Sequence, residues 1–220
     1  VTHCGYKKLA FADPLYAEIS EAFGVEMIAL KHRPHKEIEF PFLSLSMCTS
    51  RDYVNAVLAC LSQKAQEKGL DFDHRRELHK PRSPRWTLRM WGDEYRRQNH
   101  GDGYWISQMI GRIQFLKKEV EQDRFVISDV RYHNEKELVR RYGGALWNIT
   151  RNTAPLRVGE HGSEVDPVEF DPDVVINNSF PIKHLFNVVL ARHVELDCGL
   201  RNVVVAVGDQ TPEAIGYGRD

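Results

Sequence analysis

An excess of charge of either sign is the first thing that the sequence lacks. Its 220 residues include 30 Lys and Arg against 31 Asp and Glu, which gives a net charge of −1. A balance of this kind supplies no electrostatic reason to bind a nucleic acid or a membrane surface. No apolar run is long enough to span a bilayer, and no signal peptide is visible. We therefore expect a cytoplasmic protein with no membrane partner.

Closely spaced cysteines and activated nucleophiles are also missing. The four cysteines lie far apart and none forms a C-x-x-C pair, which argues against a disulfide framework or a zinc ribbon and favours a reducing compartment. Two pairs of histidines stand close together in the sequence, His32 with His35 and His74 with His79. Neither pair has further ligands beside it, so no metal site is predicted. No Ser or Cys lies in a nucleophile motif with a base next to it, and covalent acyl transfer is not indicated.

Strand and helix patterns alternate along the chain, which predicts an α/β fold with a parallel sheet and helices on both faces. We expect one domain over residues 1–220, with a helical and loop excursion at about 31–122 and a lid-like loop at about 152–172. The predicted strands cover residues 7–12, 125–129, 145–151, 174–176 and 203–207. The predicted helices cover residues 15–23, 52–68, 86–97, 104–122 and 182–195, with one more between residue 131 and the Gly143–Gly144 pair.

Charged and polar residues follow several of these strands. Asp129 and Arg131 end one strand, and Asn134 and Glu135 come at the turn after it. Ligands of open α/β sheets bind at the carboxyl ends of the strands, and guanidinium groups from several elements would fit a phosphate dianion there. Other candidates of this kind are Asp13, Arg85, Arg97, Arg151, His161 and Glu164.

Each candidate also has an ordinary structural interpretation. Asp129 and Arg131 could form a salt bridge, and Asp13 could cap a helix. Arg85 and Arg97 lie in a basic stretch that could be a solvated face. The residues alone leave these alternatives open.

Five segments in this order resemble the deoxynucleoside monophosphate kinases, best known from bacteriophages, over about Lys7 to Val189. They are KLAFADPL, SPRWTLRMWGDEYRR…YWI, VISDVRYHNEKE…GGALWNITR, HGSE and DVVINNSF. The resemblance implies a P-loop kinase fold with a mobile lid, in the host cytoplasm if the protein is viral. It implies transfer of the γ-phosphate of ATP to a deoxynucleoside monophosphate with Mg²⁺, and it suggests a homodimer.

The resemblance also implies roles for the candidate residues. Asp129, Arg131 and Glu135 would contact the acceptor nucleotide, with Asp13 and Asn134 near them, and Arg85 would contact its phosphate. Arg97 and Arg151, together with Arg131, would stabilise charge during transfer. His161 and Glu164 would belong to the lid-side loop.

The family's glycine-rich loop, G-x-x-x-x-G-K-[DST], should precede the first matching strand, but nothing stands before Val1. The form G-x-x-x-x-G-K-[ST] occurs nowhere in the chain, and position 89 is Arg where the family more often has Gln. The tail offers a degenerate substitute in Gly216, Gly218 and Arg219, with Arg219 in the position of the Lys. The chain would then be circularly permuted.

Permutation requires residues 203–207 to form a central, parallel strand beside the strands that end at Asp13 and Asp129. The alternative is an edge strand followed by a disordered tail. Two further hypotheses remain: a catalytically silent nucleotide-binding or structural homologue, and a phosphotransferase that acts on a modified base or within DNA. The basic segment HRRELHKPRSPR favours the latter, although the balanced net charge argues against a nucleic-acid partner.

Overall fold

The computed structural model describes residues 5–150, 171–197 and 204–209. The chain forms two compact units. Residues 12–108 make up one of them, the helical unit, and the sheet unit combines the segments before and after it. Helix α7 (Tyr104–Glu119) begins in the helical unit and ends in the sheet unit. The two units are described separately below.

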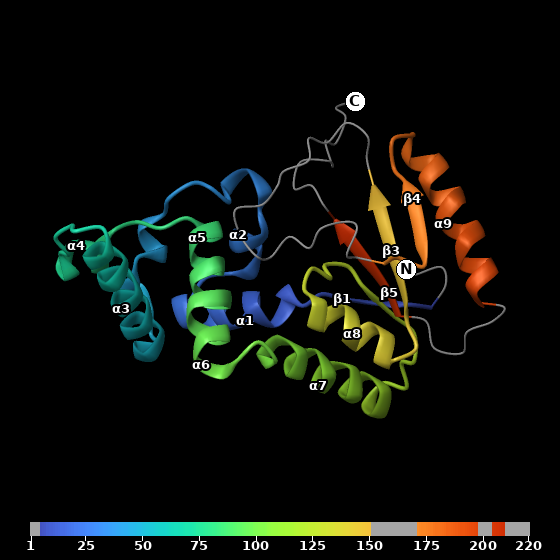
Figure 1. The fold of residues 1–220 in the computed structure, drawn as a ribbon, viewed down its shortest axis with the longest axis horizontal. Coiled ribbons are helices and arrows are strands. Elements are labelled where there is room, and N and C mark those ends of the chain that lie inside the picture. The colour runs from blue at the N-terminus through green and yellow to red at the C-terminus, as the bar shows by residue number, and fades with distance from the viewer. Residues whose placement is uncertain (1–4, 151–170, 198–203, 210–220) are drawn as a thin grey trace. The chain divides into compact units, whose positions relative to one another are not determined.

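The described strands of the sheet unit form one five-stranded sheet in the order β1-β2-β5-β3-β4, and all neighbouring strands are parallel (Figure 1). The elements of this unit after α7 alternate between strand and helix, apart from the successive strands β3 and β4. In chain order the sheet unit contains β1 (Lys7–Leu9), β2 (Phe125–Ile127), α8 (His133–Arg141), β3 (Ala145–Thr150), β4 (Val174–Asn177), α9 (Ile182–Asp197) and β5 (Val204–Asp209).

Helices cover both faces of this sheet. Trp147 and Ile176 lie in a buried cluster against which α9 packs with Leu185, Val188 and Val189. Side chains alternate between faces along a strand, so Leu146, which is also buried, belongs to the opposite face. The chain moves one way across the sheet through α8 and back through α9, and right-handed crossovers place these helices on opposite faces.

The predicted α/β class with parallel strands is therefore confirmed. The strand predicted at 203–207 is β5, and it is central and parallel, between β2 and β3. Part of the expected placement is wrong, because β5 is not beside β1: β2 lies between them. The first strand also ends earlier than predicted, at Leu9, and Asp13 lies in the first turn of the helix that follows.

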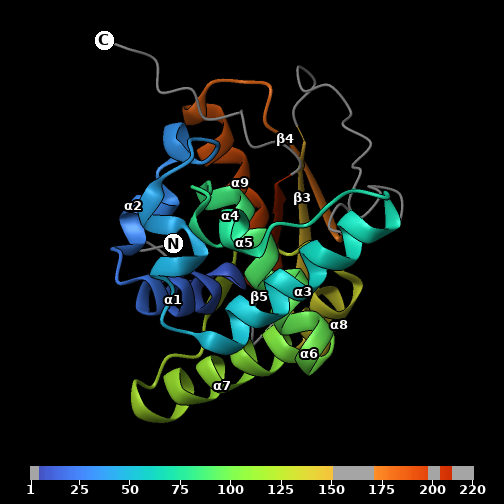
Figure 2. The same cartoon turned by 90° about the vertical axis from the view of Figure 1, so that its left-hand side faces the viewer.

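The described residues of the helical unit contain no strand. Its first helix begins at residue 12, earlier than the excursion predicted from about residue 31. In chain order its helices are α1 (Ala12–Phe23), α2 (Met27–Lys31), the short 3₁₀ turns η2 (Arg33–His35), η3 (Pro41–Leu43) and η4 (Leu45–Met47), then α3 (Arg51–Glu67), α4 (His74–His79), α5 (Pro84–Arg89), the π-helix η5 (Met90–Arg97) and α6 (Gln98–His100). Figure 2 gives a second view of α1, α3 and α5.

Side-chain caps explain where two of these helices begin. The Ser50 hydroxyl accepts the backbone N–H of Tyr53 at the start of α3, and the Ser83 hydroxyl accepts that of Trp86 at the start of α5. Pro84 occupies the first turn of α5, where a missing N–H costs nothing. The helix predicted at 52–68 is thus confirmed as α3.

Aromatic side chains dominate the core of the helical unit. Tyr53 and Trp91 are fully or almost fully buried, and their ring centroids lie 4.4 Å apart, while Phe23 and Tyr95 contact both rings edge-on or tilted. The helix predicted at 86–97 is divided: α5 ends at Arg89 and a π-helix continues to Arg97. π-helical turns are rare and are often found at functional sites.

The basic segment at 74–85, which its polar sequence places at the surface, is exposed over much of its length but not throughout. It contains α4, and Arg82 is buried, with its guanidinium 4.0 Å from the ring centroid of Trp86 and paired with Glu77. None of the helices in the described ranges is long and apolar enough to cross a membrane.

Candidate functional site

Asp129 links the ends of the two neighbouring strands β1 and β2. Its Oδ1 accepts the backbone N–H of Phe11 at 2.8 Å, and the N–H of Ser128 donates to the carbonyl of Leu9 at 3.1 Å. The carboxylate is therefore held at the carboxyl edge of the sheet, where sequence analysis expected a ligand contact.

Glu135 stabilises the turn between β2 and α8. It is 3% exposed, and its Oε2 accepts the backbone N–H groups of Arg131 at 2.7 Å and of Tyr132 at 3.1 Å. This arrangement forms half of a capping box at the start of α8. These two bonds of Glu135 are thus to its own turn, and its predicted contact with a nucleotide stays a prediction.

Arg131 is the cation that this turn presents. Its side chain is exposed, and in the described part of the chain no residue pairs with its guanidinium. Asn134, half-buried, lies in the first turn of α8, where helical N–H groups add partial positive charge. The turn therefore combines a fixed backbone with a guanidinium that is available to an anion.

Strand β5 ends at the same edge. Its last residue, Asp209, pairs in register with Ile149 of β3. Ala206, three positions earlier on β5, pairs with Ile127, the last residue of β2. Several predicted site residues lie outside the described residues: Arg151, His161, Glu164, Gly216, Gly218 and Arg219. Most of the predicted lid-like loop at 152–172 does so too.

The remaining predicted residues belong to the helical unit, and each has an oppositely charged partner there. Asp13 pairs with Lys31 at 3.2 Å, Arg85 with Glu37, and Arg97 with Asp93 at 3.4 Å. Asp13 and Arg85 are about half exposed, whereas the Arg97 side chain is 13% exposed. Their convergence on the sheet edge stays a prediction.

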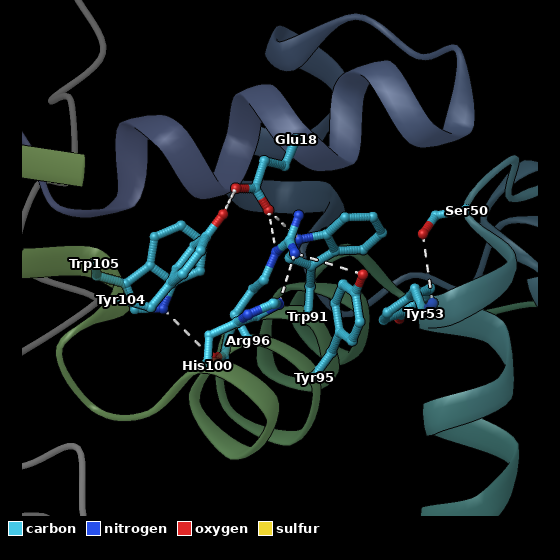
Figure 3. Close-up of polar contacts among 10 residues, drawn as sticks. Glu18, Ser50, Tyr53, Trp91, Tyr95, Arg96, His100, Tyr104 and Trp105 are labelled. Carbon is cyan, nitrogen blue, oxygen red and sulfur yellow. Dashed lines mark hydrogen bonds and ion pairs between the residues drawn. The ribbon is translucent and has the colours of Figure 1, made fainter. Parts of the chain in front are cut away.

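Sequence analysis missed a polar network centred on Glu18 of α1 (Figure 3). Its Oε2 accepts the indole N–H of Trp91 at 2.6 Å and the Nε–H of Arg96 at 2.7 Å, and its Oε1 accepts the Tyr104 hydroxyl at 2.5 Å. The Arg96 guanidinium also lies 4.6 Å from the ring centroid of Tyr95 and 5.0 Å from that of Tyr104. One carboxylate thereby joins α1, η5 and α7.

Two proton donors of this network, the Tyr104 phenol and the Arg96 guanidinium, have raised pKa values. Burial raises the pKa of Tyr104 to about 12, and the hydrogen bond to Glu18 adds to the rise. Burial by itself would lower the pKa of Arg96, but the hydrogen bond to Glu18 and the charge interactions with Glu18, Tyr104 and Tyr95 together outweigh burial and raise that pKa. The phenol and the guanidinium both stay protonated at neutral pH, which is what a structural role for the network requires.

A metal centre is not formed by the described residues alone, since none of them make a group of three or more His, Cys, Asp or Glu that could hold an ion. Comparison with known proteins gave no match: no family model, no curated protein and no solved structure is similar enough to report. The sheet edge around Asp129 and Arg131 is therefore the candidate site on the chain's own geometry.

Proposed function

We propose that this chain transfers the γ-phosphate of ATP to a deoxynucleoside monophosphate at the carboxyl edge of its sheet, as a circularly permuted kinase of the P-loop type. The observation that carries the proposal is the position of β5, central and parallel in the sheet. Permutation requires a central, parallel strand next to the one that ends at Asp129, and β5 is such a strand, although β2 separates it from β1. A C-terminal edge strand would have excluded permutation.

The donor nucleotide would bind where the chain leaves β5. β5 ends at the edge that also bears Asp129, and the sequence after it includes Gly216, Gly218 and Arg219. Backbone N–H groups of a glycine-rich turn suit phosphate oxygens, and Arg219 would supply the cation that the family takes from Lys. A guanidinium can bind phosphate in two-pronged fashion, although its reach differs from that of an ammonium.

The acceptor would bind beside the turn between β2 and α8. Arg131 would bind its phosphate, assisted by the N–H groups of the first turn of α8. Mg²⁺ would neutralise phosphate oxygens; it is usually held by one or two carboxylates together with the phosphates, and Asp129 is a described carboxylate at this edge. Catalysis then depends on in-line positioning and on charge stabilisation by the guanidinium groups.

A coupled ADP-release assay with ATP, Mg²⁺ and each deoxynucleoside monophosphate tests the proposal. We expect turnover with one or two acceptors, and a loss of about 10²-fold or more in kcat/KM for Arg131→Ala. Arg141→Ala is the matched control, because Arg141 lies on the exposed side of α8 and pairs only weakly with Glu137, at 3.7 Å. Its kcat/KM should stay within about twofold of the parent.

The donor half of the proposal needs its own variant. Arg219→Ala should raise the KM for ATP while leaving acceptor binding unchanged, because only the donor phosphates would contact this residue. An unchanged KM for ATP in an active enzyme would contradict the permuted donor site but not the kinase activity.

The second candidate is a catalytically silent nucleotide-binding homologue, and the absence of the sequence G-x-x-x-x-G-K-[ST] favours it. Calorimetry separates the two. Binding of a monophosphate that is lost in Arg131→Ala, without any turnover, would support the silent homologue. Absence of both binding and turnover would contradict both candidates.

A further inference from the structure

Glu135 is a buried carboxylate that hydrogen-bonds to the backbone of its own turn. Its Oε2 accepts two N–H groups, that of Arg131 at 2.7 Å and that of Tyr132 at 3.1 Å, and the residue is only 3% exposed. A side chain that contacts a nucleotide must present accessible surface to it, and an almost fully enclosed one presents very little. The burial of Glu135 therefore favours a role within the protein over a contact with the nucleotide.

Arg131 is the residue on which such a role would act. Val130, immediately before it, is 2% exposed and anchors the chain in the core, and the N–H of Arg131 itself is bound to Glu135. The backbone at Arg131 is thus held from both sides, while its side chain is exposed. A fixed Cα limits the conformations that a long arginine side chain must give up when its guanidinium binds an anion.

The turn needs an acceptor at Glu135 more than it needs a charge there. A charged acceptor makes shorter and stronger hydrogen bonds than a neutral one, which suits two N–H groups that converge on one oxygen. The same negative charge opposes a phosphate bound close by, because like charges repel. A glutamine offers an amide oxygen without the charge, so it should keep the two bonds in weaker form.

We propose that Glu135 is a positioning residue that acts through Arg131. It holds the backbone of the turn so that the Arg131 guanidinium meets the acceptor phosphate, and it does not itself contact the nucleotide. The inference rests on the proposed function, because it takes Arg131 as the phosphate contact. Loss of positioning weakens binding of every monophosphate alike, whereas loss of a contact to the base or sugar changes the ranking of the acceptors.

A double-mutant cycle with Arg131 tests the proposal. Calorimetry gives the Kd of each deoxynucleoside monophosphate, and the coupled assay gives its kcat/KM, which stays measurable when binding is weak. Glu135→Ala should lower affinity and kcat/KM by about tenfold or more, with the ranking of the acceptors unchanged. The combined variant R131A/E135A should match Arg131→Ala within about twofold, because positioning matters only while the guanidinium is present. Losses that multiply in the combined variant would overturn the proposal.

Two further variants serve as matched comparisons. Glu135→Gln should recover affinity to within about fivefold of the parent, since it keeps an acceptor oxygen. Glu137→Ala should stay within about twofold, because Glu137 is an exposed glutamate on the same helix whose pair with Arg141 is long, at 3.7 Å. Circular dichroism verifies that each variant is folded. If Glu135→Gln loses as much as Glu135→Ala, or if it changes the ranking of the acceptors, the proposal is wrong.

Hydrogen exchange tests the positioning without any ligand. The backbone amides of Arg131 and Tyr132 should exchange about tenfold or more faster in Glu135→Ala than in the parent, and unchanged rates would contradict the proposal. The ligand experiments separate this inference from the proposed function. A parent that neither binds nor phosphorylates any deoxynucleoside monophosphate contradicts both. A parent that binds one through Arg131, but binds it equally well as Glu135→Ala, contradicts the positioning role alone.

Discussion

The helical unit and the sheet unit each bury a tryptophan, and the indole N–H groups of these two side chains are satisfied differently. In the helical unit, the Glu18 carboxylate receives donors from Trp91, Arg96 and Tyr104. In the sheet unit, Trp147 is as deeply buried as Trp91, yet within the described ranges its indole N–H has no partner. One core is fixed by directional side-chain bonds, and the other by strand pairing and apolar contact.

The difference follows from what each architecture must specify. Strand pairing fixes the register of a sheet through the backbone, so its side chains need only fill space. Helices satisfy their backbone internally and leave relative orientation to side chains, which makes a carboxylate shared by α1, η5 and α7 valuable. As a result, the helical unit uses its Arg96 internally, while among the described residues of the sheet unit none pairs with the guanidinium of Arg131.

Removal of the shared carboxylate should have the largest effect. Glu18→Ala leaves a guanidinium, an indole N–H and a phenol without their acceptor, and we expect a loss of about 2–4 kcal/mol in the free energy of unfolding. Glu21→Ala, at an exposed position of the same helix, should change it by less than about 0.5 kcal/mol. Urea unfolding measures both; equal losses would mean that the network does not hold the unit together.

The two tryptophans offer a direct test of the comparison. Trp91→Phe removes a bonded N–H and leaves Glu18 short of a donor, which should cost about 1–3 kcal/mol. Trp147→Phe removes an N–H that no described residue accepts, so relief of its burial offsets part of the lost packing and the cost should be smaller. Thermal unfolding compares the stabilities of the two variants. A larger loss of stability for Trp147→Phe than for Trp91→Phe would contradict the proposed difference between the two indole N–H groups.

The Tyr104 phenol should give the network a dependence on alkaline pH. Its pKa is raised to about 12 in the folded protein, from an ordinary value of 10, so its contribution is complete below pH 10 and is lost as the pH rises towards 12. Stability of the parent should fall by about 1–2 kcal/mol more than that of Tyr104→Phe across this window. Parallel declines in the two proteins, measured by urea unfolding, would show that the phenol is not held in the network.

Sequence reasoning succeeded where the signal is local. The alternation of apolar runs with helix-period segments located β2, β3 and β5, and the helix predicted at 52–68 is confirmed as α3. These features depend on neighbours within a few residues, which a pattern search can detect.

The misses involve contacts between distant residues. Glu18 meets Trp91 and Arg96 across more than 70 positions, and nothing around Glu18 distinguishes it from a solvated carboxylate. The π-helix has a helical period in its sequence, so the pattern does not distinguish it from the α-helix predicted over the same residues. Arg131 and Glu135 lie within one turn, and there the sequence singled out both residues but did not predict the bond between them.

The smallest effect should come from the ion pair of Lys64 and Glu94, which ties α3 to η5 at the surface of the helical unit. Their atoms lie 2.6 Å apart, but the Lys64 side chain is 51% exposed, and a pair of this kind contributes at most about 1 kcal/mol. The bond to Lys64 lowers the pKa of Glu94, so the contribution is present above the ordinary Glu pKa and is lost as the pH falls below it. A double-mutant cycle with Lys64→Met and Glu94→Gln, measured at low and high salt, gives the coupling free energy between the two side chains. A coupling that exceeds the cost of Glu18→Ala would contradict the view that the buried carboxylate, and not the surface pair, fixes the helices of this unit.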